Sequence, residues 1–385
     1  MPKNKLVITI FKDYLDYGGD TNFFISILKF CKHLKTNLIL NNIDNNKNIN
    51  LKEVQLLDKF YINKFVKFKY NKNILDTFIN KILYIYLPIN LFFLFIEFLL
   101  ILKKNKPNLV ISFNGGYPGS YNALVLCFAC KYLNIKNYLF IASLPSKKSL
   151  RTIYDTIIDF FIKKSCKYII TNSKYQKRLL SELRLFPKEN IKVINNPISI
   201  NKKNKKNKKN FLNLCTVSRL DKDKKVDVLI KSMINLKDKI KNFKFMIIGS
   251  GPELNNLKCL VKKEKLESYV EFLGYLNSNE LITKLQSIDI FLFSSTKEGL
   301  PFSILEAINY KIPVICNKFN AISNIFKNKK HIIYTKNGNT EEFANLINML
   351  NNKKNMYENI KRNAHKILIK RFNINNINKS FLKLL

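Results

Sequence analysis

Two glutamates, Glu298 and Glu306, flank a predicted turn into a helix, where acidic side chains can act on hydroxyl groups. An apolar run over 288–293 predicts a strand, and Gly299 and Pro301 then predict the turn. The unpaired N–H groups and the dipole of a helix N-terminus favour an anion such as phosphate. Carboxylates at this edge would instead accept hydrogen bonds from hydroxyls. The pattern predicts a ligand with both phosphate and hydroxyl groups; the alternative is a helix start with incidental acids.

The residues from Ser294 to Ala307 resemble the Glu-x7-Glu motif of retaining glycosyltransferases of the family 4 type. These enzymes use nucleotide-sugar donors and have the GT-B fold. The resemblance implies that Glu306 binds the ribose hydroxyls and that Glu298 orients the sugar, either as nucleophile or as stabiliser of an oxocarbenium-like state. It also implies donor contacts from the turn and helix start, which are Gly299, Leu300, Pro301, Phe302 and Ser303.

A second turn supplies two cations. Residues 218–227 read SRLDKDKKVD and resemble the family pattern Gly-Arg-Leu-x-x-x-Lys-Gly-x-Asp. Arg219 and Lys224 match the two cations that hold the donor diphosphate, and fixed positive charge aimed at such a leaving group lowers the barrier. Ser218 and Lys225 stand where glycines are usual. Surface basic residues of a basic protein are the alternative explanation.

Asp221 and Asp223 form an Asp-x-Asp pair, which in the other glycosyltransferase fold type would bind a divalent metal. Here the pair lies inside the loop between the two cations. Side chains and backbone dipoles supply the positive field in the implied scheme, so we expect no metal and no cofactor. The expected substrate is a nucleotide-sugar, with a UDP-sugar favoured.

Glycine turns after other predicted strands match further donor contacts of the family. Gly249 and Gly251 begin a Gly-x-Gly-Pro-Glu turn, and Leu276 follows a glycine at the next strand end. Gly18 and Gly19 follow the first predicted strand, where glycine lets the backbone approach a phosphate or sugar closely. Ordinary tight turns would have the same composition.

The glycine-rich loop over 114–119 follows a predicted strand of the first half and is expected on the acceptor side. Many family members carry a histidine in the loop that corresponds to 141–145. This sequence has Ala142, Ser143 and Leu144 there, which puts a histidine-based activation of the acceptor in doubt.

Strand-like and helical runs alternate along the chain, which is typical of α/β proteins with parallel sheets. The resemblance implies GT-B: two Rossmann-like doubly wound domains facing a central cleft. We expect an acceptor domain over 1–198, a Lys- and Asn-rich linker over 199–210, a donor domain over 211–370 and a C-terminal helix over 371–385 that returns to the first domain. The segment 41–81 is left without a prediction. Expected strands are 6–10, 37–40, 109–113, 138–141, 168–171, 192–194, 212–217, 243–248, 270–272, 288–293, 313–315 and 331–334.

The length and composition are consistent with two folded domains, but they do not identify a binding partner. The chain has 385 residues, 67 basic and 27 acidic, with a formal charge of +40. Such charge is typical of proteins that bind nucleic acid or anionic lipid. No RNA-binding module and no basic face interleaved with aromatic residues is evident, so we expect no nucleic-acid partner. Joint enrichment in Lys and Asn also indicates that part of the charge is ordinary solvated surface.

The segment 82–102 is nearly all apolar and approaches the length of a membrane span. Pro88 favours a shorter helix over 88–102, because proline is well placed at a helix start. Apolar residues all round this helix predict a part in the core and a part facing a membrane. The seven cysteines are an odd number without a spaced framework, which favours reduced thiols in the cytoplasm.

The family resemblance implies a hexosyl- or N-acetylhexosaminyltransferase that keeps the anomeric configuration. The expected acceptor is a glycan or a lipid-linked glycan of surface polysaccharide, lipopolysaccharide or glycoconjugate synthesis. We expect the enzyme in the cytoplasm, in peripheral contact with the anionic inner face of the membrane. Two alternatives remain: a basic nucleic-acid-binding protein, and a GT-B epimerase, which would need no acceptor.

Overall fold

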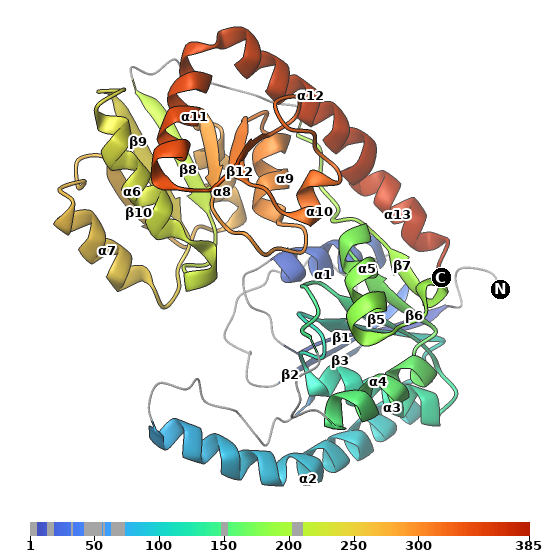
Figure 1. The fold of residues 1–385 in the computed structure, drawn as a ribbon. Coiled ribbons are helices and arrows are strands. Elements are labelled where there is room, and N and C mark those ends of the chain that lie inside the picture. The colour runs from blue at the N-terminus through green and yellow to red at the C-terminus, as the bar shows by residue number, and fades with distance from the viewer. Residues whose placement is uncertain are drawn as a thin grey trace. The chain divides into compact units, whose positions relative to one another are not determined.

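The computed structural model describes residues 6–13, 19–31, 34–41, 56, 58–62, 74–147, 153–201 and 211–385. The chain forms two compact units (Figure 1), the first made of Met1–Asn195 with Asn378–Leu385 and the second of Asn196–Ile377. Each unit has a parallel β-sheet with interleaved helices, as expected for a doubly wound α/β protein.

The first unit contains a seven-stranded sheet in the order β3-β2-β1-β4-β5-β6-β7, with every pairing parallel. The strand order reverses between β1 and β4, so this point is the topological switch of the sheet. The strands are β1 Val7–Lys12, β2 Lys35–Asn41, β3 Asp58–Ile62, β4 Leu109–Asn114, β5 Lys136–Ile141, β6 Tyr168–Thr171 and β7 Ile191–Val193. The helices are α1 Gly19–Phe30, α2 Ile74–Asn105, α3 Tyr121–Tyr132, α4 Ile153–Ser165 and α5 Lys174–Arg184.

The second unit has a six-stranded parallel sheet in the order β10-β9-β8-β11-β12-β13, which reverses between β8 and β11. Its strands are β8 Leu212–Val217, β9 Phe243–Ile248, β10 Val270–Gly274, β11 Ile290–Phe293, β12 Val314–Asn317 and β13 Ile333–Thr335. Its helices are α6 Val226–Lys237, α7 Leu254–Lys263, α8 Ser278–Leu285, α9 Phe302–Asn309, α10 Asn320–Ser323, α11 Thr340–Asn352 and α12 Lys354–Phe372.

The last helix, α13 Ile374–Leu382, runs into the segment that belongs to the first unit. The Tyr138 hydroxyl donates a hydrogen bond to the carbonyl of Leu384, and the Phe381 ring lies 5.9 Å from that of Phe30. Contacts of a terminal segment with a strand and a helix of the first unit therefore anchor the chain end there. Of the predicted linker, 202–210 lies outside the described residues.

The α/β fold class predicted from the sequence is confirmed, and the strands agree with the predicted ranges to within about two residues. Two local features differ. Strand β3 lies in the segment that received no prediction. The predicted helix start at Pro88 is wrong, because α2 begins at Ile74 and continues through this proline. An interior proline costs a helix about 3 kcal/mol, and here packing of the following turns offsets that cost, since Phe98 and Leu102 are buried in the core.

Candidate active site

The predicted site residues Arg219, Lys224 and Glu298 lie in loops that leave the switch point of the second sheet. Strands β8 and β11 are direct neighbours, so the loops after them start at the same edge. The two loops are also joined, because the Ser294 hydroxyl after β11 donates a 2.6 Å hydrogen bond to the Lys224 carbonyl after β8. Asn317, the last residue of β12, extends the connection because its side-chain amide donates a hydrogen bond to the Ser294 carbonyl. These hydrogen bonds therefore fix the loop that carries Arg219 and Lys224 against the loop that carries Glu298.

Lys224 and Glu298 form an ion pair at the centre of this structure. The Lys224 Nζ lies 2.5 Å from Glu298 Oε1, and the two side chains are 23% and 15% exposed. The pairing holds the ammonium and the carboxylate at one point, although 74 positions separate them in the chain. Two of the predicted catalytic residues are thus brought together.

Arg219 lies in the same loop but is 67% exposed, and its Nε lies 3.0 Å from Asp221 Oδ2. This contact explains one acid of the Asp-x-Asp pair as the partner of an arginine. In the part of the chain that the structure describes, no group of three or more His, Cys, Asp or Glu residues is arranged to hold a metal ion.

The helix start that was predicted to bind the diphosphate is formed by α9. This helix begins at Phe302 after Pro301, whose ring supplies no side-chain cap. Its first N–H groups therefore lack the usual capping oxygen. The preceding Gly299 and Leu300 are buried, while Pro301 and Ser303 are half-buried.

Two serines beside these loops carry unused hydrogen-bonding groups. Ser218 follows β8 and Ser295 follows β11, and the buried Oγ atom of each has no hydrogen-bond partner among the described residues. Buried hydroxyl groups without partners are costly unless a ligand or water completes them. They are suited to a polar ligand that lies at the switch point.

Asn196 is a positioning residue that none of the sequence motifs indicated. Its side chain is 1% exposed, and its Nδ2 donates a 2.7 Å hydrogen bond to the Leu300 carbonyl in the Gly-Leu-Pro turn. The interaction spans 104 positions. An asparagine before a proline gives no sequence signal for such a contact, since only the folded chain brings the two segments together.

Glu306 is the fifth residue of α9 and keeps part of its surface accessible. Desolvation by burial nevertheless raises the pKa of its carboxyl from 4.5 to about 7. Hydroxyl donors would favour the ionised form, because a carboxylate only accepts hydrogen bonds. A ligand with vicinal hydroxyls, such as a ribose, would therefore stabilise the ionised carboxylate of Glu306.

Replacing Glu306 with Gln is expected to remove a pH dependence of stability. The folded-state pKa lies above the unfolded value, so the neutral carboxyl stabilises the fold below about pH 4.5, and this contribution is lost as pH rises towards 7. Wild type should lose roughly 2–4 kcal/mol relative to Glu306→Gln over this range. Urea unfolding of both proteins at several pH values measures the difference, and parallel pH profiles would contradict the assignment.

Gly249 and Gly251 have a structural role of their own, which is the close approach of two loops. Gly249 has φ +132°, and a Cβ atom there would lie 1.9 Å from the Ser218 carbonyl oxygen. A Cβ at Gly251 would lie 2.6 Å from the Leu220 oxygen. These glycines therefore let the loop after β9 pack against the loop that carries Arg219.

The predicted contact residue Leu276 lies half-buried, two positions beyond the end of β10.

Lys225 stands where the family motif has glycine, and its backbone has φ 50° and ψ 40°, the left-handed conformation that favours glycine. This conformation costs a residue with a side chain about 1–2 kcal/mol. The free energy of unfolding of Lys225→Gly is expected to be equal to that of wild type or higher by up to about 1 kcal/mol. That of Lys225→Val should be lower by about 1–2 kcal/mol. Thermal unfolding of both variants checks the order, and a more stable valine variant would contradict it.

In the first unit, Gly19 begins α1, and Gly18 lies outside the described residues. The loop over 114–119 follows β4 at the switch point of this sheet. The Asn114 side chain donates to the Pro118 carbonyl at 2.7 Å and accepts from the Ser120 N–H at 2.9 Å. Gly119 has φ +60° and must be glycine here, since a Cβ would lie 2.2 Å from Asn114 Oδ1.

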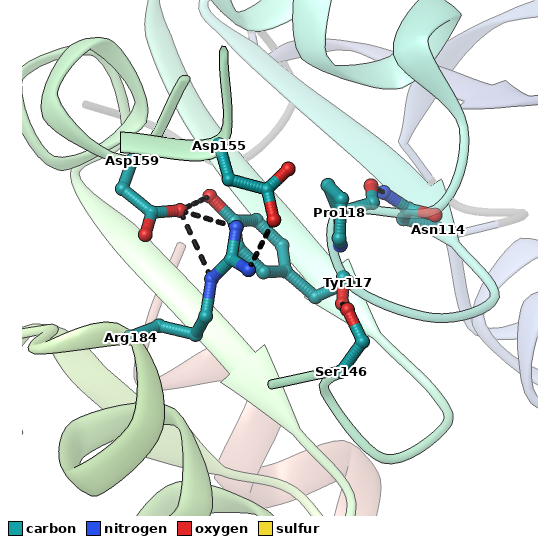
Figure 2. A network of polar contacts seen from close by, with 7 residues as sticks. All are labelled: Asn114, Tyr117, Pro118, Ser146, Asp155, Asp159 and Arg184. Atoms are coloured by element: carbon teal, nitrogen blue, oxygen red, sulfur yellow. Dashed lines mark hydrogen bonds and ion pairs between the residues drawn. The ribbon is translucent and has the colours of Figure 1, made fainter. Parts of the chain in front are cut away.

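A buried ion network, formed by residues of α4 and α5, contacts the loop over 114–119 through Tyr117 (Figure 2). Arg184 on α5 is fully buried and lies 2.8 Å from Asp155 Oδ2 and 2.9 Å from Asp159 Oδ1, both on α4. The Tyr117 hydroxyl of the loop donates a 2.8 Å hydrogen bond to Asp159 Oδ1. Desolvation acts to lower the pKa of Arg184, but its hydrogen bonds to both aspartates raise it overall. The guanidinium is therefore charged and fixed under the loop.

The sequence analysis missed this network. Its available signal was a pair of acids one helical turn apart in the otherwise apolar run of α4. A buried charge needs a partner, so the spacing of Asp155 and Asp159 indicated a cation. It did not indicate which of the many basic residues would be that cation.

The chain is similar to known proteins in both sequence and structure. Residues 196–367 match the family model for group 1 glycosyl transferases. An uncharacterized glycosyltransferase of Haemophilus influenzae is 28% identical over 194 residues, which are 50% of this chain and 54% of that protein. The alpha-monoglucosyldiacylglycerol synthase of Acholeplasma laidlawii is 28% identical over 136 residues, 35% of this chain and 34% of that enzyme. The chain thus spans about half or less of the length of these curated relatives.

Among solved structures, HepE of Anabaena in complex with UDP and glucose superposes with a TM-score of 0.73 at 17% identity. The superposition covers 98% of this chain and 99% of HepE. At this identity the likeness establishes the fold. The chain therefore has the GT-B fold, and its residues 196–367 carry the sequence pattern of the group 1 glycosyl transferases.

Proposed function

We propose that the chain is a retaining glycosyltransferase that moves a hexosyl or N-acetylhexosaminyl group from a nucleotide diphosphate, with UDP favoured, to a glycan or lipid-linked acceptor. One observation carries the proposal. At the switch point of the second sheet, the partly buried pair of Lys224 with Glu298 lies in joined loops beside the uncapped start of α9, and Glu306 follows one turn later. The cation and the helix N-terminus suit the diphosphate of a donor. The carboxylates of Glu298 and Glu306 suit its sugar and its ribose.

In the proposed reaction the bond between the anomeric carbon and the β-phosphate oxygen breaks, and the electron pair leaves with the nucleoside diphosphate. Lys224, Arg219 and the N–H groups at the start of α9 stabilise the charge on that leaving group. The acceptor oxygen forms the new bond on the same face, and its proton passes to the departing phosphate oxygen. Glu298 orients the sugar, and Glu306 accepts hydrogen bonds from the ribose. This scheme requires no metal or cofactor.

Relatives support the choice of donor and acceptor class. HepE was crystallised with UDP and glucose, and the relative from Acholeplasma is named as making a glucosyl diacylglycerol. These names support a glycan or lipid-linked glycan as the acceptor. We propose in addition that the enzyme works at the cytoplasmic face of a membrane.

A screen of UDP-, GDP- and ADP-sugars by thermal shift tests the donor, because a ligand that binds only the folded state raises the unfolding temperature. A shift with a UDP-sugar that is lost in Glu306→Ala supports the proposal, and the absence of a shift with every donor opposes it. Product analysis then separates the alternatives. An epimerase would convert a free nucleotide-sugar without any acceptor. Salt-sensitive retention on nucleic acid without turnover would favour a nucleic-acid-binding protein.

A further inference from the structure

A row of large apolar side chains is exposed along one side of α2 in the first unit. Tyr86, Ile89, Phe93, Ile96 and Leu100 are 54%, 55%, 58%, 39% and 66% exposed. Their spacing of three and four residues places them on one face of the helix. Exposed apolar residues are common singly, whereas a contiguous row marks an interaction surface.

The opposite side of the same helix is part of the core. Leu94, Phe98 and Leu102 follow each other at intervals of four residues and are at most 5% exposed. The Phe98 ring packs edge-on against Phe11 of β1, with centroids 5.6 Å apart. By length and composition Tyr86–Asn105 would suffice to cross a membrane, with a mean hydropathy of 1.9. If α2 crossed a bilayer, its buried residues would lose their contacts with the sheet of the first unit.

The exposed row continues onto the neighbouring helices. In Figure 1, α2, α3 and α4 lie side by side in the first unit, and α3 contacts both of the others. On α3, Tyr132 is 68% exposed, and its ring lies 6.0 Å from that of Phe95 on α2. On α4, Phe160 and Phe161 are about half exposed, and the ring centroid of Phe161 lies 5.7 Å from that of Phe128 on α3. We call this surface of α2, α3 and α4 the apolar face.

Exposed lysines accompany the apolar face. Lys103 and Lys104 lie in the last turn of α2, Lys131 lies in that of α3, and Lys164 lies in that of α4, where its Nζ is 4.1 Å from the centre of the Phe160 ring. Acids are few on these helices: α2 contains Asp76 and Glu97, α3 contains none, and the two of α4 are the buried partners of Arg184. Lysine stems can lie along an apolar layer while their ammonium groups reach phosphate.

We propose that the apolar face docks the first unit on the surface of a bilayer that contains anionic phospholipid, with α2 lying in the interface and not crossing it. Aromatic and aliphatic side chains next to lysines are the composition of interfacial helices. The charge of the lysines complements anionic headgroups, and a bilayer can cover three helices at once. This inference deepens the lipid-linked part of the proposed function by naming the surface that brings the enzyme to its acceptor.

The test is sedimentation of the full chain with vesicles, without any sugar donor. Wild type should pellet with mixed phosphatidylcholine and phosphatidylglycerol vesicles, and less with phosphatidylcholine alone. Phe93→Ser with Leu100→Ser should weaken binding about tenfold or more, because two exposed anchors are lost. Phe211→Ser with Ile369→Ser is the matched control, since these residues are 48% and 40% exposed in the second unit, and it should bind like wild type.

The lysines have a matched control as well. Lys103→Ser with Lys104→Ser should reduce binding to anionic vesicles, whereas Lys262→Ser with Lys263→Ser, an exposed pair in the last turn of α7, should not. The proposal is overturned by equal binding of the apolar-face variant and its control, by resistance of bound protein to alkaline extraction, or by an apolar-face dimer that forms without lipid. Sugar transfer to a soluble acceptor is measured separately, so loss of either proposal leaves the other intact.

Discussion

Replacing Lys224 with Met is expected to lower kcat/KM for the nucleotide-sugar about 10²- to 10³-fold, the range for loss of one preorganised charge stabiliser in an active site. Lys224 contacts Glu298 at 2.5 Å, and both side chains are mostly buried. The variant removes the positive charge for the leaving diphosphate and leaves Glu298 without its partner. Because the charge develops mainly as the bond breaks, kcat should fall more than KM rises.

Lys222→Met is the matched control, since Lys222 lies in the same short 3-10 helix but is exposed. It should retain turnover within about twofold, because exposed charges contribute little. Steady-state kinetics with the donor found in the screen measures both variants. A Lys224→Met enzyme with wild-type kcat, or an equal loss in Lys222→Met, would remove Lys224 from the proposed mechanism.

Arg184→Leu is expected to destabilise the first unit by about 3–5 kcal/mol, the cost of removing one partner from a buried ion pair. The guanidinium is fully buried between Asp155 and Asp159 and lies 5.0 Å from the centre of the Tyr117 ring. Its loss would leave two aspartates buried without the cation that neutralises them. The loop over 114–119 would also lose the fixed position of Tyr117, so turnover should fall together with stability.

Arg178→Leu provides the control on the same helix, α5. Arg178 and its partner Glu182 are 53% and 56% exposed, so the expected loss is under about 0.5 kcal/mol. Combining Arg184→Met with Asp155→Asn and Asp159→Asn should recover part of the stability, because no buried charge remains. Urea unfolding measures all three proteins. If Arg184→Leu were as stable as Arg178→Leu, the network would not support the unit.

The sequence pattern of the proposed donor site was recognisable because each of its parts is local. The turn into α9, the cations after β8 and the glycines after β9 lie within short segments, and their spacing carries the signal. The alternation of strands and helices likewise predicted parallel sheets. Strand β3 and the passage of α2 through Pro88 were not predictable in this way, because packing against distant segments overrides local preference.

The sequence by itself predicted the fold class, the strands other than β3, and a set of candidate donor residues, since periodicity and motif spacing are properties of neighbouring positions. The tertiary structure decided which of these residues meet. It paired Lys224 with Glu298, placed Asn196 under the Gly-Leu-Pro turn, chose Arg184 among 67 basic residues as the buried partner of two aspartates, and left one side of α2 exposed. Burial and pairing depend on contacts across the whole unit, which no short segment contains.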